Sequence, residues 1–527
     1  MSFVSYLFIG FVFVLMVLYF IVPLRIRCYV LLAGSLFFYY QSGWQGMVFI
    51  GIAALITYGS GLVIGHLRMS TPSARGGSKK EGTSHSQEES IRIDHKDSAF
   101  AVLMLSMLFL IAMLAYAKTG NYIVDVFDQA FQGEPLTVSV IIPLGISYYT
   151  FAAIGYLADV YWKKDQAEKN PFKLMLYLCY FPQILQGPIP KHKKLAPLLS
   201  EGHRFDYDRV CFGLQRAVWG FFKKLVIADR LAIMVNQVFN NYQNYSGFVY
   251  LVGLTGAVFQ LYADFSGCMD IALGVSEVFG ITLEENFKRP FFSTSAAEFW
   301  RRWHISLGAW FKDYVYMPLS TASWVIAVGK FFRNHVSKSA GRNIVTTIPL
   351  LVVWILTGLW HGTGADYLVW GLYWGGIIIL STWLAPVYRN LNQRFGLTND
   401  LGWWRVVRQI RTFVIYMIGR LLTLPGDLLV SFWIGQKVFT FNPWVFSDGT
   451  LLNLGWDEKD VWVVCIALLI LWRVSVLQEK GIRIRQSIAK WPLPIRWAFY
   501  LGAIFAVLIF GVYGAGTSGT TFVYMNY

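Results

Sequence analysis

The chain has 527 residues, of which 56% are hydrophobic and 17% aromatic, while only 14% are charged. Soluble globular domains carry about 25% charged residues, so this composition excludes an ordinary soluble domain. The net charge of +15 is compatible with nucleic-acid binding. However, the basic residues lie in short loops between apolar runs, as topology signals of membrane proteins do. We therefore expect a lipid bilayer as the partner and no nucleic acid.

Apolar runs recur along the whole chain, and a helix needs about 20 such residues to cross the hydrocarbon layer. Several runs are too short or too broken to cross alone. The sequence therefore predicts an all-α, polytopic membrane protein with about 11–14 membrane helices. In chain order, the candidate spans lie near residues 3–23, 28–43, 46–66, 99–117, 137–157, 173–187, 209–236, 246–262, 265–281, 345–360, 366–386, 408–432, 460–477 and 494–514.

Two stretches interrupt this pattern. Residues 67–98 are rich in Ser, Gly and mixed charge, which predicts a disordered cytoplasmic loop. Residues 182–197 contain four prolines, which oppose a continuous helix. Backbone of that kind is tolerated at membrane depth only inside protein or beside a water-filled cavity. We find no internal repeat and interpret residues 1–527 as a single domain.

The segment 286–319 carries many aromatic and charged residues. Ser295 and Glu298 have the spacing of a capping box at a helix start, and Pro290 keeps the chain before them out of the helix. Glu298 and Arg302 are placed for an ion pair four residues apart. At helical spacing, one aromatic face would carry Trp300, His304, Leu307 and Phe311. The alternative is an interfacial helix whose Trp and Arg residues lie at the headgroups.

His361 ends an uncharged run and is followed by Gly362 and Gly364, which predicts a helix that breaks at the histidine. An ionisable residue buried in a membrane segment is costly and marks a candidate functional site. Imidazole, with an ordinary pKa near 6.5, can accept and return a proton at neutral pH. His361 is therefore a candidate general base for attack of a hydroxyl on a thioester. The alternative is a core histidine that donates to a backbone carbonyl.

Asp264, Ser266 and Asp270 lie inside an otherwise apolar stretch. Carboxylates at such depth require partners, and we expect them to serve a structural or substrate-positioning role. The candidate partners are Lys288, Arg289, Arg301 and Arg302. The five cysteines show no metal-ligand spacing, and we expect no metal.

Taken together, these segments resemble the membrane-bound O-acyltransferase family. The resemblance is strongest to its bacterial branch, which serves alginate and peptidoglycan O-acetylation and D-alanyl transfer to teichoic acids. About 230 residues carry it, in the same order as in the family. The matching segments are 142–161, 180–189, 220–231, 262–274, 285–292, 298–319 and 356–371.

The resemblance implies a ring of helices around a thin central floor, with a transmembrane tunnel where donor and acceptor meet. The near-invariant histidine of the family falls on His361, which would then be the general base. The second histidine falls on His304, which would orient the donor or stabilise developing charge. The supporting or substrate-binding positions implied are Asp264, Asn286, Arg301, Trp303 and Trp360.

The function that follows is O-acetylation of an extracytoplasmic polysaccharide or peptidoglycan from cytoplasmic acetyl-CoA. The enzyme would lie in the bacterial cytoplasmic membrane and use no cofactor besides the acyl donor. We expect an extracytoplasmic partner resembling an SGNH esterase, because the chain has no soluble domain to hold a polymer. One alternative is D-alanyl transfer to teichoic acid from a carrier protein. A transporter or channel is the alternative of another class, since broken helices also line ion pathways.

The tail, residues 515–527, ends with Phe522, Tyr524 and Tyr527 in an F-x-Y-x-x-aromatic pattern. Similar tails occur in this bacterial branch, where the middle tyrosine is implicated as an acyl carrier. The last position is Tyr527, where phenylalanine is commoner. The resemblance therefore makes Tyr524 a possible acyl relay, and the alternative is a frayed aromatic terminus without a role.

Replacing Tyr524 with Phe is expected to abolish export of acyl groups, because Phe lacks the hydroxyl that would accept the acyl group. The aromatic ring is kept. Transfer of labelled acetyl to the extracytoplasmic acceptor in membrane vesicles measures this. Full activity of Tyr524→Phe would rule out the relay.

Overall fold

The computed structural model describes residues 1–69, 85–131, 142–398 and 401–513. The fold is 79% helical and contains no strand in the described part, which confirms the all-α prediction. Six of the described helices are long and apolar enough to cross a membrane, or up to eight if two bent pairs count as one span each. The chain is therefore a multi-pass membrane protein. The number of full-length spans is below the 11–14 expected, partly because some apolar helices, such as α1, are short.

The chain divides into two compact units, each described separately here. The first comprises residues 6–210 and 276–283, together with Met1. In it α3 packs against α4 and α5, and α2 packs against α6. The helices of the first unit are α1 Tyr6–Ile21, α2 Arg27–Tyr40, α3 Trp44–Met69, α4 His85–Phe131, α5 Ile146–Tyr161, α6 Pro171–Cys179, α7 Phe181–Ile184 and α8 His192–Ser200.

The single domain of residues 1–527, the ring of helices and the transmembrane tunnel stay predictions.

Two sequence predictions fall within the first unit. Of the loop expected at 67–98, residues 67–69 end α3 and residues 85–98 begin α4, while 70–84 lie outside the described residues. The proline-rich stretch leaves the helical conformation between α7 and α8, as the prolines predict. Pro182 and Pro197 differ, since Pro182 lies in the first turn of α7 and Pro197 lies inside α8.

The second unit comprises residues 211–275 and the chain from 284 onward, with residues 2–5. Its longest helix, α11, was predicted as two spans, 246–262 and 265–281, but is one helix of 31 residues. The polar residues near Asp264 are thus helical and do not mark a break. The helices are α9 Tyr207–Phe221, α10 Asp229–Asn240, α11 Phe248–Val278, α12 Ala296–Arg302, α13 Ile305–Phe311, α14 Met317–Ser320, α15 Ser323–His335, α16 Lys338–His361, α17 Ala365–Trp383, α18 Ala385–Arg394, α19 Gly402–Leu421, α20 Leu428–Lys437, α21 Glu458–Glu479, α22 Ile484–Ile488 and α23 Leu493–Phe510. The first few residues of α9 and the last of α11 belong to the first unit.

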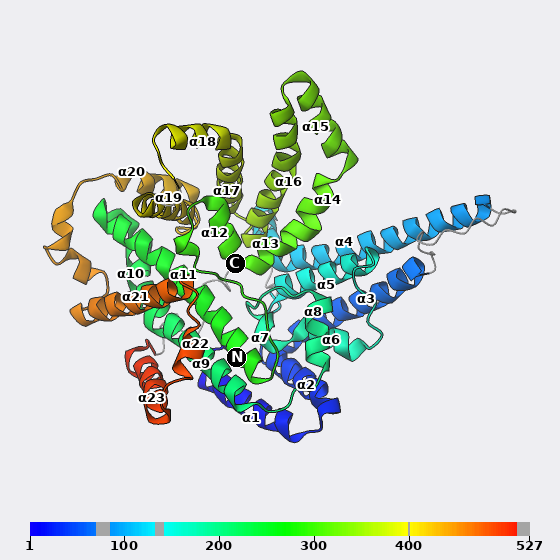
Figure 1. The fold of residues 1–527 in the computed structure, drawn as a ribbon, viewed down its shortest axis with the longest axis horizontal. Helices are drawn as coiled ribbons and strands as arrows, with labels where there is room; N and C mark the ends of the chain where they lie inside the picture. The colour runs from blue at the N-terminus through cyan, green and yellow to red at the C-terminus, as the bar shows by residue number, and fades with distance from the viewer. Residues whose placement is uncertain (70–84, 132–141, 399–400, 514–527) are drawn as a thin grey trace. The chain divides into compact units, whose positions relative to one another are not determined.

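Helices α16 and α17 pack side by side (Figure 1). Their contact depends on glycine, because a Cβ on Gly371 would lie 2.5 Å from the Trp354 carbonyl oxygen. A Cβ on Gly358 would lie 2.4 Å from the Tyr367 carbonyl oxygen. Small residues at such crossings let helix backbones approach closely in membranes. The close approach fixes the end of α16, where His361 lies.

Replacing Gly371 with Ala is expected to destabilise the protein by about 1–3 kcal/mol, because the new methyl group overpacks a backbone contact. The matched control is Gly376→Ala on the same helix, where nothing lies within 4 Å of the new Cβ. There the higher helix propensity of Ala is expected to stabilise by up to about 1 kcal/mol. Thermal unfolding in detergent measures both. Equal unfolding temperatures for the two variants would contradict the packing argument.

Candidate functional site

A short backbone pairing between two loop segments organises the site. Phe287 and Trp303 form an isolated antiparallel bridge. On either side of it, the Lys288 N–H donates to the Arg302 carbonyl at 2.9 Å and the Ile305 N–H donates to the Asn286 carbonyl at 3.0 Å. We call residues 286–305 the His304 hairpin. Its two arms, 286–289 and 302–305, are joined by the chain that contains α12.

The hairpin corrects the prediction of one amphipathic helix through His304. Helix α12 ends at Arg302, Trp303 is extended, and His304 has φ 47° before α13 begins at Ile305. Trp300, His304, Leu307 and Phe311 therefore do not share one helical face. The break arises because the backbone at Arg302 and Ile305 pairs with the other arm and not with the preceding helical turn. A left-handed conformation is uncommon for a residue with a Cβ, and such strain is concentrated at functional sites.

The start of α12 is close to the prediction. Ser295 accepts the Glu298 N–H through its hydroxyl, at 3.2 Å. The Glu298 carboxylate does not complete a capping box, since it accepts the N–H and hydroxyl of Thr294, both at 2.9 Å. Glu298 and Arg302 form the predicted pair, at 2.8 Å. Burial raises the pKa of Glu298, but these hydrogen bonds and Arg302 outweigh it, so the pKa lies below its ordinary value.

His304 is buried, with 7% of its surface exposed. Its Nδ1 lies 3.3 Å from the Asn286 amide nitrogen, while the Asn286 amide oxygen accepts the N–H and hydroxyl of Ser306. The oxygen thus faces Ser306 and the amide N–H₂ faces the imidazole. If Nδ1 accepts a hydrogen bond from this amide, the single ring proton of neutral His304 is on Nε2. Phe265 of α11 packs edge-on against the ring, with centroids 4.9 Å apart.

His361 is the last residue of α16, and Gly362 and Gly364 separate it from α17. The predicted helix break is therefore confirmed. His361 is half-buried, which corrects the expectation of a buried histidine, and it lies at the end of its helix. Trp370 of α17 contacts His361 edge-on, with ring centroids 5.0 Å apart.

Trp360 connects the two histidines. Its ring centroid lies 4.7 Å from that of His361 and 6.1 Å from that of His304. Residues separated by 57 positions in sequence are thus gathered around one indole. The predicted catalytic pair and one predicted supporting residue share a single site within the second unit.

Asp264 and Asp270 on α11 are paired with cations that the sequence analysis did not select. Lys224 lies 2.7 Å from Asp264 and also 2.8 Å from Asp229. Lys223 contacts Asp270 at 2.6 Å. Both lysines belong to a π-helical segment between α9 and α10, Phe222–Ala228, where a wider turn presents them to α11.

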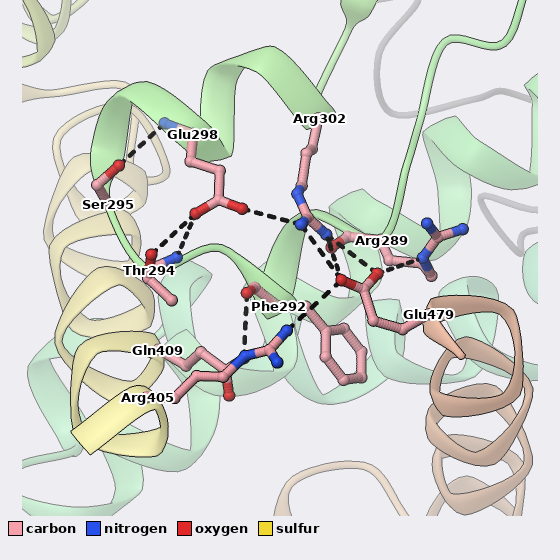
Figure 2. Close-up of polar contacts among 9 residues, drawn as sticks. All are labelled: Arg289, Phe292, Thr294, Ser295, Glu298, Arg302, Arg405, Gln409 and Glu479. Atoms are coloured by element: carbon pink, nitrogen blue, oxygen red, sulfur yellow. Dashed lines mark hydrogen bonds and ion pairs between the residues drawn. The ribbon is translucent and has the colours of Figure 1, made fainter. Parts of the chain in front are cut away.

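A second cation, Arg216 of α9, completes the pairing of Asp270 at 2.9 Å and also binds Glu285. The prediction of ion-pair partners from the sequence was wrong for both aspartates. The predicted partners were Lys288, Arg289, Arg301 and Arg302. Arg289 and Arg302 bind Glu479 instead (Figure 2). Two adjacent lysines inside the apolar run 220–231 were the available signal, since ionisable residues there require partners.

The structure describes two of the three remaining predicted residues, Arg301 and Trp303. Arg301 is exposed on α12, and no contact joins it to either histidine in the described part of the chain. Trp303 is buried, stacks on Phe299 at 5.6 Å and meets Phe287 edge-on at 5.0 Å. It is thus part of the hairpin packing. Tyr524 lies outside the described residues.

The sequence is similar to a family model and to several known proteins. The family model described as MBOAT, membrane-bound O-acyltransferase family, matches residues 166–421. A protein of Azotobacter vinelandii named probable alginate O-acetylase AlgI is 30% identical over 439 residues, 82% of this chain and 76% of that protein. The Helicobacter pylori peptidoglycan O-acetyltransferase is 29% identical, covering 57% of this chain and 58% of that protein. The Bacillus subtilis teichoic acid D-alanyltransferase is 30% identical, covering 44% and 56%.

The chain belongs to the membrane-bound O-acyltransferase family. It is therefore a multi-pass membrane acyltransferase, as the resemblance in its motifs predicted. The matched residues 166–421 contain both histidines, the His304 hairpin and the lysine pair. In this membrane-bound O-acyltransferase, Trp370 is a further candidate site residue, which was not predicted from the sequence. Its position nine residues after His361 gave no signal, because the contact forms only when α17 folds back along α16.

Replacing Lys224 with Met is expected to lower the free energy of unfolding by about 3–5 kcal/mol, because buried carboxylates lose their partner. The side chains of Lys224 and Asp264 are 1% and 0% exposed. Lys330→Met, at an exposed position of α15, serves as the control and is expected to have little effect. Thermal unfolding in detergent measures both, and an unchanged unfolding temperature for Lys224→Met would contradict the pairing.

Proposed function

We propose that this acyltransferase takes acetyl from cytoplasmic acetyl-CoA and delivers it across the membrane for O-acetylation of an extracytoplasmic polysaccharide or peptidoglycan. One structural observation carries the proposal: His304 and His361 flank Trp360, in a family where two long-matching relatives are named for alginate and peptidoglycan acetylation. Two imidazoles at one indole supply both a proton acceptor and a hydrogen-bond donor for acyl transfer.

In the proposed chemistry, His361 removes the proton of an attacking hydroxyl as its oxygen bonds to the thioester carbonyl carbon. The carbon–sulfur bond then breaks, and His361 returns the proton to the leaving thiolate. The products are an acetyl ester and the thiol, so protons and electrons balance. A half-buried ring at a helix end suits this role, because it can meet a substrate and still be held by Trp370. No resident metal or cofactor is required for these steps.

His304 is assigned the complementary role in this proposal. With Nδ1 facing the Asn286 amide nitrogen, the ring proton of neutral His304 is on Nε2, and we assign this N–H to the negative charge that develops on the carbonyl oxygen. A buried donor held in a fixed orientation is effective for this purpose because it needs no reorganisation during the reaction. The pair would thus divide the work between a base and an electrostatic stabiliser.

The hydroxyl that attacks acetyl-CoA belongs to Tyr524 or to the acceptor. The final transfer would use an extracytoplasmic partner resembling an SGNH esterase, and the proposed location is the bacterial cytoplasmic membrane. The family and its multi-pass architecture support a membrane site for the first transfer. A separate partner is proposed because the described part of the chain is mostly helical and six of its helices are long and apolar enough to cross a membrane.

D-alanyl transfer from a carrier protein is the second candidate within the same class. The relative named for it aligns with 44% of this chain, whereas the alginate relative aligns with 82%. The longer match favours acetyl. Labelled acetyl-CoA and a D-alanyl-loaded carrier protein, supplied in turn to the same vesicles, distinguish the two donors.

Replacing His361 with Ala is expected to reduce acetyl transfer to background, at least about 1,000-fold, because the general base is lost. Transfer from labelled acetyl-CoA is measured in liposomes that contain the purified protein and an acceptor system. His335→Ala is the control, because His335 ends α15, hydrogen-bonds the Phe331 carbonyl of its own helix and lies outside the site.

A transporter or channel would respond differently. Loss of one histidine would then alter apparent affinity and leave turnover largely intact. Retained turnover in His361→Ala, or no acetyl transfer by the unaltered protein with all partners present, would overturn the proposed function.

A further inference from the structure

Glu479 is the last residue of α21, and its side chain contacts a cluster of arginines. Its carboxylate accepts from Arg289 Nε at 2.6 Å and from Arg302 Nη1 at 3.2 Å (Figure 2). The three side chains are between 19% and 29% exposed, so water screens the contacts only in part. Charge-assisted hydrogen bonds in such surroundings are among the stronger polar contacts in proteins.

The two arginines come from opposite arms of the His304 hairpin. Arg289 ends the arm that carries Asn286, and Arg302 begins the other arm, directly before Trp303 and His304. Arg302 also reaches across to the Arg289 carbonyl, at 3.5 Å. The Glu479 carboxylate therefore joins the two segments whose separation sets the distance between Asn286 and His304.

Glu479 differs from the rest of the site in its place along the chain. It lies 177 residues after Arg302, and beyond residue 421, where the match to the family model ends. Without its carboxylate, the guanidinium groups of Arg289 and Arg302 would repel across the hairpin, with only Glu298, the other partner of Arg302, to offset the repulsion. One acidic residue from the C-terminal helices thus pairs with two arginines of a hairpin that belongs to the family segment.

We infer that Glu479 is a positioning residue for acyl transfer, which holds the two arms together so that Asn286 keeps the His304 ring in its reactive orientation. The inference rests on the proposed role of His304. Glu479 contacts neither histidine through the bonds described above, so its effect passes through Arg289 and Arg302. A small displacement of a reacting group can cost up to about 100-fold in rate, which sets the scale of the effect.

The test compares Glu479→Gln with Glu479→Asp and with the control Arg405→Gln. Arg405 belongs to α19, is 51% exposed and lies 3.7 Å from Glu479, so its removal leaves both hairpin contacts in place. We expect Glu479→Gln to lower kcat for acetyl transfer by up to about 100-fold at unchanged KM for acetyl-CoA. Glu479→Asp keeps the charge and should recover part of kcat, and Arg405→Gln should match the unaltered protein.

A double variant shows whether the effect passes through the hairpin. Asn286→Ala releases the His304 ring directly, so adding Glu479→Gln to it should cost much less than Glu479→Gln costs alone. Independent multiplication of the two losses would overturn the inference. So would a Glu479→Gln variant whose only change is a lower unfolding temperature or yield, with kcat per folded molecule intact.

The result is separable from the proposed function. If His361→Ala abolishes transfer while Glu479→Gln transfers normally, the positioning role fails and the acyltransferase proposal stands. If His361→Ala retains turnover, the proposed function fails, whatever the result for Glu479.

Discussion

The backbone pairing between residues 286–288 and 302–305 is the constraint on which the site depends. In a membrane protein, each buried backbone N–H and carbonyl group must find a partner within the protein. A helix that breaks near His304 would leave several such groups unpaired. The bonds from Lys288 to Arg302 and from Ile305 to Asn286 pair them, and this allows the chain to leave the helix there. The break in turn lets His304 adopt a conformation that no helix interior offers.

Charge pairing stabilises the elements around this hairpin. Lys223 and Lys224 bind the carboxylates of α11, the helix that also presents Phe265 to His304. Glu479 binds the arginines of both hairpin arms (Figure 2). In each case an ion taken out of water is paired with opposite charge, since an unpaired one would cost several kcal/mol. Pairing fixes geometry as well, because each carboxylate can be satisfied only when specific helices meet.

The two histidines differ in ways that suit different tasks. His304 is buried, held by Asn286 and enclosed by aromatic rings, whereas His361 is half-buried at a helix end beside two glycines. Trp360 and Trp370 restrict the His361 ring without covering it fully. In the proposed mechanism, a fixed donor and an accessible base would therefore operate beside Trp360. This division follows from the surroundings, since the two side chains are chemically identical.

The sequence by itself determined the features that depend on neighbouring residues. Composition required a membrane protein, Gly362 and Gly364 ended α16 at His361, and the spacing of Glu298 and Arg302 set their ion pair. Only the tertiary structure decided the helix break at His304, the lysine partners of the aspartates and the contact of Glu479 with the His304 hairpin. The physical reason is that helical propensity and spacing act over about four residues. The backbone and charge pairs that override them join residues 14 to 190 positions apart, and nothing in the local pattern specifies which partner will meet them.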